Sequence, residues 1–102
     1  MRMNSSIPDN AVRPWQAEMR RILRAAYPKG VPADEYELLV YVLSNRMSFR
    51  SVAHLLEDCG VRDYPGVYND VLGIVDRHEL YAEKAKPILE KLIRHGYDPA
   101  AE

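Results

Sequence analysis

Residues 27–45, YPKGVPADEYELLVYVLSN, decide the fold. The first six contain two prolines and a glycine, which predict a tight, stiff connector. Pro32 fits the first position of a helix because its fixed φ is already helical, and Asp34 and Glu35 then complement the positive end of the helix dipole. Apolar side chains surround much of this helix, which should run to about Asn45. We therefore expect it to be the central and most buried element.

The segment before this stretch has the spacing of an amphipathic helix. Its apolar residues recur at i, i+4, i+7, i+8 and i+11, which places them on one face. Pro14 fits the first turn, where its missing N–H costs nothing, and Pro28 disfavours helical geometry at Tyr27. We expect a helix from about Val12 to Ala26. Its apolar face comprises Trp15, Met19, Ile22, Leu23 and Ala26.

Two further helices are expected after the central one. Ser48 is placed to cap the start of the first, and Gly60 is placed to end it in a left-handed conformation. A loop over residues 61–65 leads to the second, which contains Gly73. An interior glycine costs about 1 kcal/mol relative to alanine, so either a neighbouring backbone passes close to Gly73 or the helix is locally weak. The inward positions predicted for these two helices are Val52, Leu55, Leu56 and Cys59, and then Tyr68, Val71, Leu72 and Val75.

A last helix ends at Gly96, with Tyr97 positioned for the hydrophobic contact that often accompanies a glycine stop. Pro87 leaves its start open between two alternatives. The helix begins near residues 84–86 with Pro87 in its first turn, or it begins near Ala82 with a lost hydrogen bond and a kink. The apolar residues of this helix are Ala85, Ile88, Leu89, Leu92 and Ile93.

These segments together predict an all-α fold, a compact five-helix bundle. No alternating apolar and polar run is long enough to predict a strand. We expect one helical domain over residues 12–98, preceded by a flexible N-terminal segment (1–11) and followed by a C-terminal tail (99–102).

The connector also carries a family resemblance. The string Tyr27-Pro28-x-Gly30-Val31-Pro32, followed by Tyr36, Leu39, Leu43, Arg46, Met47-Ser48 and Val52, resembles a small actinobacterial, prominently mycobacterial, all-helical family catalogued only as a domain of unknown function. The likeness covers about residues 12–98. It implies a soluble, monomeric bundle of five α-helices with no assigned activity, ligand or catalytic residue.

The chain departs from this family pattern at two places. Phe49 and Arg50 stand where the family tends to have acidic residues, and Tyr97 stands where it tends to have tryptophan. Arg50 in a first turn opposes the helix dipole, so we expect a weaker cap there. The matching residues are mostly hydrophobic, proline or glycine and specify the fold, so no catalytic residue can be carried over.

Composition and charge narrow the function further. The net charge is −1, with +4 over residues 1–30, −6 over 31–83 and +1 over 84–102, and the isoelectric point is about 6.3. A nucleic-acid-binding domain usually has a basic footprint, so we consider that class unlikely. The longest apolar run, Leu38 to Leu43, has six residues and is too short to span a membrane. A single cysteine and no signal-like apolar stretch fit a cytoplasmic protein.

The residue types that could act in catalysis or bind a metal do not form a catalytic or metal-binding pattern in this sequence. His54 and Cys59 point in different directions on one helix, and Cys59 fits a core position. His78 and His95 are each expected in the last turn of a helix, where a ring that is cationic or hydrogen-bonding favours the negative end. The carboxylate pairs Asp34-Glu35, Glu57-Asp58 and Asp70 with Asp76 are expected to be solvated. We therefore predict no enzyme, no cofactor and no metal.

The most suggestive group is basic. Arg13, Arg20 and Arg24 recur at i, i+7 and i+11, opposite the apolar face of the first helix, with Arg21 nearby. This stripe either pairs with the acidic middle of the same molecule or contacts an anionic partner, such as an acidic protein surface.

The favoured hypothesis is a non-catalytic interaction module, monomeric and without a membrane segment. The alternative is a nucleic-acid-associated regulator that uses the basic stripe or a helix-turn-helix-like pair formed by the third and fourth helices. The loop between those two helices is longer than that motif normally has, and the fourth helix is poor in basic residues.

Overall fold

The proline and glycine positions divide the chain into short helices, and the computed structural model describes residues 14–98. Its α-helices are α1 (Pro14–Ala26), α2 (Ala33–Ser44), α3 (Phe49–Asp58), α4 (Tyr64–Val75) and α5 (Lys86–Arg94), with a 3₁₀-helix, η2 (His78–Leu80), before α5. Residues 14–98 contain no strand, and the predicted five-helix, all-α fold is confirmed. The expected flexible segment and the tail at 99–102 lie outside the described residues.

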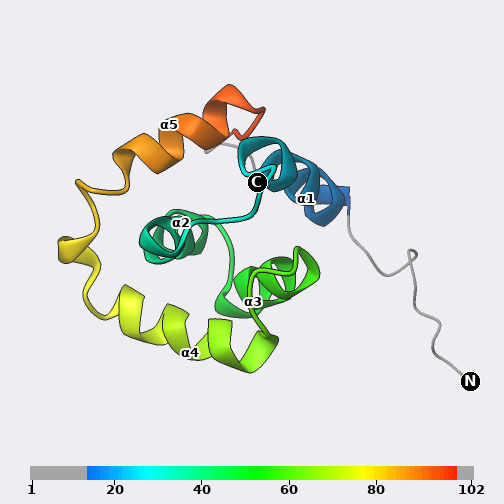
Figure 1. The fold of residues 1–102 in the computed structure, drawn as a ribbon. Coiled ribbons are helices and arrows are strands. Elements are labelled where there is room, and N and C mark those ends of the chain that lie inside the picture. Colours follow the sequence, from blue (N-terminus) through cyan, green and yellow to red (C-terminus); the bar gives the residue numbers. More distant parts are fainter. Residues whose placement is uncertain (1–13, 99–102) are drawn as a thin grey trace, which may run out of the picture.

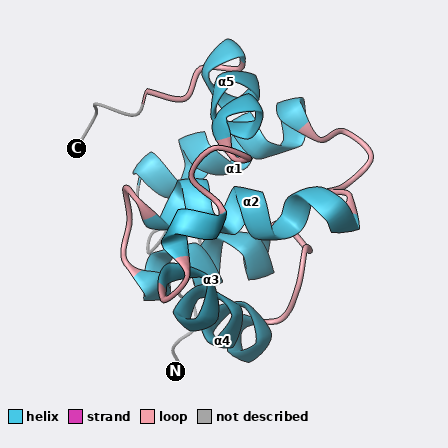
Figure 2. Cartoon of the chain, turned by 90° about the vertical axis from the view of Figure 1, so that its left-hand side faces the viewer, coloured by secondary structure: helices cyan, strands magenta, loops and turns pink. Residues whose placement is uncertain are grey.

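Helix α2 is the central element, as its all-round apolar surface predicts. It packs against α3, α4 and α5, and both views place α4 and α5 on opposite sides of it (Figures 1 and 2). Leu39, Val40 and Leu43 are completely buried, and Val42 is 5% exposed. Burial on several sides at once explains why the apolar residues of α2 do not form a single stripe.

Pro32 differs by one position from the prediction. Its φ of −63° is helical, but its ψ of 148° is extended, so it flanks α2 as the N-cap and Ala33 is the first helical residue. Gly30 has a φ of 96° and donates its N–H to the carbonyl of Tyr27 at 3.0 Å. This turn reverses the chain within the connector, and an L side chain would be strained there.

The predicted ends of α3 and α5 are confirmed. The Ser48 hydroxyl accepts the Ser51 N–H at 3.1 Å, which satisfies one donor of the first turn of α3. Gly60 and Gly96 have φ values of 77° and 109°. In each case the glycine and the residue after it donate to carbonyls in the last turn of the helix, which is the Schellman arrangement.

The inward face predicted for α4 is partly wrong. The buried residues are Val67, Val71 and Ile74, whereas Leu72 is 45% exposed. Apolar side chains lie on more than one side of this helix, so spacing alone allows two faces, and packing against α2 and α3 selects the one through Val71. Ile93 of α5, which the prediction grouped with the inward residues, is likewise 44% exposed.

Helix α4 also ends before His78, which was expected to lie in its last turn. The last helical residue is Val75, and His78 begins η2, so His78 does not lie in the last turn of a long helix. Residues 76–79 are all polar and have no apolar face to bury, so packing does not reward a longer helix there. Helix α5 begins at Lys86 with Pro87 at its second position, which confirms the first of the two alternatives for its start.

Tyrosine–carboxylate hydrogen bonds connect α2 to the segments around it. The Tyr36 hydroxyl donates to Asp70 at 2.6 Å, and Arg62 also binds that carboxylate. The Tyr27 hydroxyl donates to Glu35 at 2.9 Å. On the α5 side, Lys91 binds Glu35 at 3.4 Å and sits 4.3 Å from the centre of the Tyr27 ring. These contacts connect α2 to α4, and α5 to the connector.

The stability of the fold should decrease in alkaline solution because of these two tyrosines. Burial first, and then the bonded carboxylate, raise the pKa of Tyr27 and of Tyr36. In an unfolded chain tyrosine ionises near pH 10. The stabilisation should therefore be complete below about pH 10 and be lost as the pH rises above it, because the unfolded chain then releases protons that the folded protein retains.

Urea unfolding at a series of pH values from 7 to 12, followed by circular dichroism, measures this effect. Absorbance at 295 nm should show tyrosinate forming together with unfolding in the most alkaline samples. Tyr36→Phe should reduce the alkaline loss, whereas a free energy of unfolding that is unchanged up to pH 12 would contradict the prediction.

Candidate functional site

The structure places the predicted arginine stripe beside carboxylates of the same molecule. Arg20 forms an ion pair with Asp58 of α3, with 3.1 Å between Nε and the carboxylate oxygen. Arg21 binds Glu18, one turn earlier on α1, through two of its nitrogens. Arg24 is exposed, and Arg13 lies outside the described residues. Two of the four arginines that were predicted to contact an anionic partner thus form ion pairs within the molecule.

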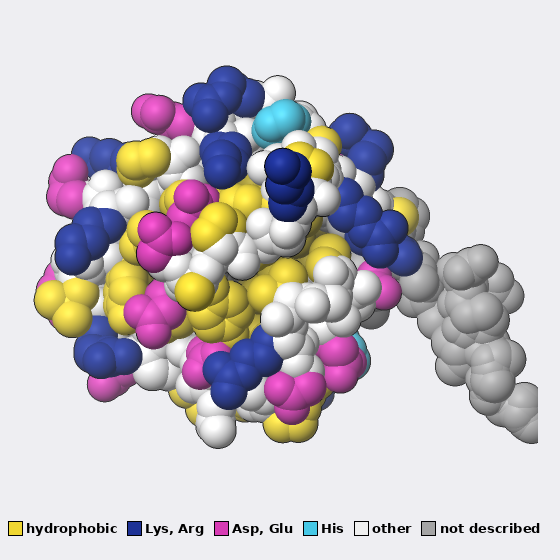
Figure 3. Space-filling model, in the orientation of Figure 1, with side chains coloured by type: hydrophobic (Ala, Val, Ile, Leu, Met, Phe, Trp, Pro, Cys, Tyr) yellow, Lys and Arg dark blue, Asp and Glu magenta, His cyan; other side chains and the backbone are white. Residues whose placement is uncertain are grey.

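The charge on the surface is uneven. Basic side chains predominate over the upper right of the face seen in Figure 3, whereas acidic and basic side chains alternate over the rest. The part with interspersed charges produces weak steering fields and offers little to a polyanion.

The histidines and the cysteine lie apart from one another. The His54 ring packs 4.7 Å from the Tyr64 ring, and His95 is the C-cap of α5. Cys59, the C-cap of α3, is only half-buried rather than a full core residue, and burial raises the pKa of its thiol. Over residues 14–98 no group of three or more His, Cys, Asp or Glu side chains is arranged to hold a metal ion.

The carboxylates have separate roles. Asp34 and Glu35 lie in the first turn of α2, as predicted. Glu57 accepts the Tyr64 N–H at 3.1 Å, and Asp70 accepts the Tyr36 hydroxyl. Asp76 is the C-cap of α4. These placements assign structural contacts to the carboxylates and bring no two of them together as an acid–base pair.

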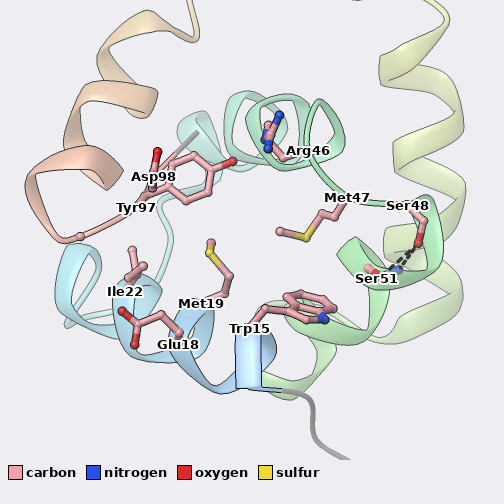
Figure 4. A pocket seen from close by; sticks show the side chains of 11 residues that line it. Trp15, Glu18, Met19, Ile22, Arg46, Met47, Ser48, Ser51, Tyr97 and Asp98 are labelled. Atoms are coloured by element: carbon pink, nitrogen blue, oxygen red, sulfur yellow. Dashed lines mark hydrogen bonds between the residues drawn. The ribbon is translucent and has the colours of Figure 1, made fainter. Parts of the chain in front are cut away.

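The most promising site is a groove that sequence reasoning did not identify. It has a volume of about 430 Å³, within the range of about 300–1,000 Å³ common for ligand pockets. It lies between α1, the connector from α2 to α3, the first turn of α3 and the turn that follows α5 (Figure 4). We call it the α1 groove. Its lining comprises Trp15, Glu18, Met19, Ile22, Arg46, Met47, Ser48, Ser51, Gly96, Tyr97 and Asp98.

The floor of the α1 groove is apolar. Trp15, Met19 and Ile22 come from one face of α1, and Met47 faces them from the connector (Figure 4). Met19 and Ile22 are buried, whereas Trp15 and Met47 are half-buried and accessible from the groove. Methionine side chains are flexible and polarisable, so such a floor can adapt to apolar groups of different shapes.

Tyr97 closes the back of the α1 groove. The Schellman turn at Gly96 directs its ring into the protein, where the residue is only 7% exposed. Its hydroxyl is buried and has no hydrogen-bond partner among residues 14–98. Burial raises the pKa of Tyr97, the positive charge of Arg46 lowers it, and Asp98 has a smaller raising effect. A buried hydroxyl without a partner costs about 1–3 kcal/mol, which makes it the least satisfied polar group of the site.

The polar groups of the α1 groove are divided between its two ends. Glu18 and Asp98 lie at one end, and Arg46, Ser48 and Ser51 lie at the other (Figure 4). Glu18 is already paired with Arg21. The second end also contains the N-terminus of α3, whose first turn has no acidic residue. The groove is therefore polarised, and its positive end lies at the segment between α2 and α3.

The sequence predicted some of the apolar groove residues but not the groove itself. Trp15, Met19 and Ile22 were predicted as one apolar face, and Tyr97 as a buried contact after the last helix. The groove becomes visible only in the structure, where α1 packs on α3 and α5 and leaves Trp15 half-buried. Spacing alone does not reveal where two helices stop touching.

Comparisons with known proteins identify no relative. No protein-family model, no curated protein and no solved structure matches the chain. No helix within residues 14–98 is both long and apolar enough to cross a membrane.

Proposed function

We propose that the protein is a small, monomeric, cytoplasmic interaction module without catalytic activity, which binds an apolar segment of a partner protein in the α1 groove. The observation that supports this proposal is the groove itself, with its methionine- and tryptophan-lined floor and a buried hydroxyl that lacks a partner. The resemblance to a small actinobacterial helical family belongs to the same proposal, because it implies a fold with no assigned catalytic residue.

The floor of the α1 groove suits an uncharged apolar side chain better than a charged one. Its lining residues Glu18 and Asp98 are acidic and Arg46 is basic, and Arg21 pairs with Glu18 at the margin. The charges around the floor therefore balance formally. Large apolar side chains inserted between them would bury their own surface together with that of Trp15 and Met47, at roughly 25 cal/mol per Å².

Trp15 makes the proposal measurable, because it is the single tryptophan of the chain and it lines the groove. Selection from a phage-displayed library of random peptides should enrich sequences with one or two large apolar residues. Synthetic copies of these peptides should shift the Trp15 fluorescence to shorter wavelength as they replace water around the indole. Met47→Glu should weaken their binding at least tenfold, because it places a charge on the apolar floor.

The matched control is Leu80→Glu, at an exposed leucine outside the groove. It should leave both peptide affinity and the fluorescence shift unchanged, and circular dichroism should confirm that both variants fold. Peptides that bind without altering Trp15 fluorescence, or that lose affinity with Leu80→Glu and not with Met47→Glu, would contradict the proposal.

An anionic partner, whether an acidic protein or a nucleic acid, is the weaker proposal. Its contact residues would be the arginines of α1, yet Arg20 and Arg21 are each engaged by a carboxylate of the same molecule. A DNA duplex titrated at low and high salt tests it. Binding that weakens steeply with salt and disappears in the double variant Arg20→Glu, Arg24→Glu would favour this class over the groove.

A further inference from the structure

We propose that the α1 groove recognises the C-terminal end of its partner, a free carboxylate carried by one or two large apolar residues. This inference rests on the proposed function and specifies the chemistry of the bound segment. Three features support it: a hydrogen-bond donor without a partner, a positive end to the groove, and an apolar floor between them.

The donor is the Tyr97 hydroxyl. Tyr97 is 93% buried, and its hydroxyl has no partner within residues 14–98. In Figure 4 the ring crosses the back of the groove with its oxygen directed toward the side of Arg46. The charge of Arg46 lowers the pKa of Tyr97 more than the charge of Asp98 raises it, so the cation has the larger effect of these two charges. The hydroxyl proton can rotate, so it can be donated to an acceptor that enters between the ring and Arg46.

The positive end is formed by Arg46 and the start of α3. The first turn of a helix presents N–H groups that have no partner inside the helix, and together they act as a partial positive charge. The first turn of α3 contains no acidic residue to offset this charge, and it carries Arg50. The positive end of the helix dipole therefore remains available to attract a bound carboxylate at this end of the groove.

The floor determines what the carboxylate is attached to. Trp15, Met19 and Met47 lie between the two polar ends. A ligand with its carboxylate at the positive end would cover these three side chains with its body, so that body is apolar. At the same wall the Ser48 hydroxyl donates to the Ser51 hydroxyl and accepts the Ser51 N–H, and the Ser51 hydroxyl can in turn donate to a peptide carbonyl. This favours a peptide end over a plain fatty acid.

The test uses paired synthetic peptides with the full chain. Each peptide is an acetylated hexapeptide that ends in two residues chosen from Leu, Phe, Ile and Met, made once as the free acid and once as the C-terminal amide. Trp15 fluorescence and isothermal titration calorimetry measure affinity. The free acid should bind at least tenfold more tightly than its amide, because only the acid offers an anionic acceptor.

Two variants identify the recognising groups. Tyr97→Phe should weaken the acid about five- to tenfold and the amide by less, because the neutral carbonyl of the amide is a weaker acceptor. It should not lower the thermal denaturation midpoint, because the hydroxyl it removes has no partner in the free protein. Arg46→Gln should reduce the preference for the acid in the same way. The matched control is Tyr81→Phe, at a tyrosine that donates to Glu37 outside the groove, and it should change neither affinity.

Other outcomes separate this inference from the proposed function. Equal affinity for acid and amide, with the Trp15 shift retained, would overturn carboxylate recognition and leave the groove as an apolar docking site. Peptides that fail to bind in either form, while the Met47-dependent library peptides do bind, would also overturn the inference alone. Tighter binding of decanoate than of every peptide acid would overturn the peptide assignment.

Discussion

Leu39→Ala should lower the free energy of unfolding by about 3–5 kcal/mol, the largest effect we expect from a single substitution. Leu39 lies in α2 and is completely buried by the helices around it. Truncation removes its transfer free energy and leaves a cavity that surrounding side chains on several helices cannot fill without moving apart. Because a domain of this size is stable by only about 5–15 kcal/mol, the variant should denature more than 10 °C below the wild type.

Urea unfolding followed by circular dichroism at 222 nm measures this loss. The matched control is Leu72→Ala on α4, which removes the same atoms from a leucine that is 45% exposed. This control should lower the free energy of unfolding by no more than about 1 kcal/mol. If Leu72→Ala proved as damaging as Leu39→Ala, the inward face of α4 would contain Leu72 after all, and the assignment through Val71 would be wrong.

Substitution of alanine at two glycines should have opposite effects. Gly60→Ala should destabilise the protein by about 1–2 kcal/mol because Gly60 has a φ of 77°, a conformation in which Cβ crowds the following carbonyl. Apart from its two chain neighbours, a Cβ added there would meet no atom within 4 Å, so the loss would come from the local backbone conformation alone.

Gly73→Ala should instead stabilise the protein by about 0.5–1 kcal/mol. Gly73 lies inside α4, and an added Cβ would meet only the end of the Arg77 side chain, at an ordinary 3.7 Å. No neighbouring backbone comes close enough to require a glycine at this position. Of the two explanations that the sequence left open for Gly73, the structure therefore supports a locally weak helix. Thermal denaturation should show a lower midpoint for Gly60→Ala and a higher midpoint for Gly73→Ala than for the wild type. A loss of stability in Gly73→Ala would contradict this assignment.

The sequence predicted the elements of the fold well because their ends depend on local chemistry. Ser48, Gly60 and Gly96 act within one turn of their own positions, and the structure confirms all three. The buried face of α4 was predicted less well. Which apolar face becomes buried depends on where α2 and α3 lie, and that information is spread over the whole chain rather than contained in the spacing around Leu72.

The candidate site was the part least accessible to sequence reasoning. The arginine stripe attracted attention because charges at helical spacing are visible in a sequence, but the carboxylates beside Arg20 and Arg21 reveal themselves only when α1 and α3 are placed together. The α1 groove joins Trp15 to Tyr97, more than eighty positions apart. Neither residue departs from an ordinary core pattern, so no local signal connects them.

The central position of α2 has a consequence for the chain during its synthesis. The helices that finally enclose α2 on its sides, α4 and α5, are made after it. Until they emerge from the ribosome, the apolar circumference of α2 has few surfaces on which to pack and is a natural target for chaperones. A polypeptide that stops before α5 should therefore aggregate or be degraded rather than persist as a smaller bundle.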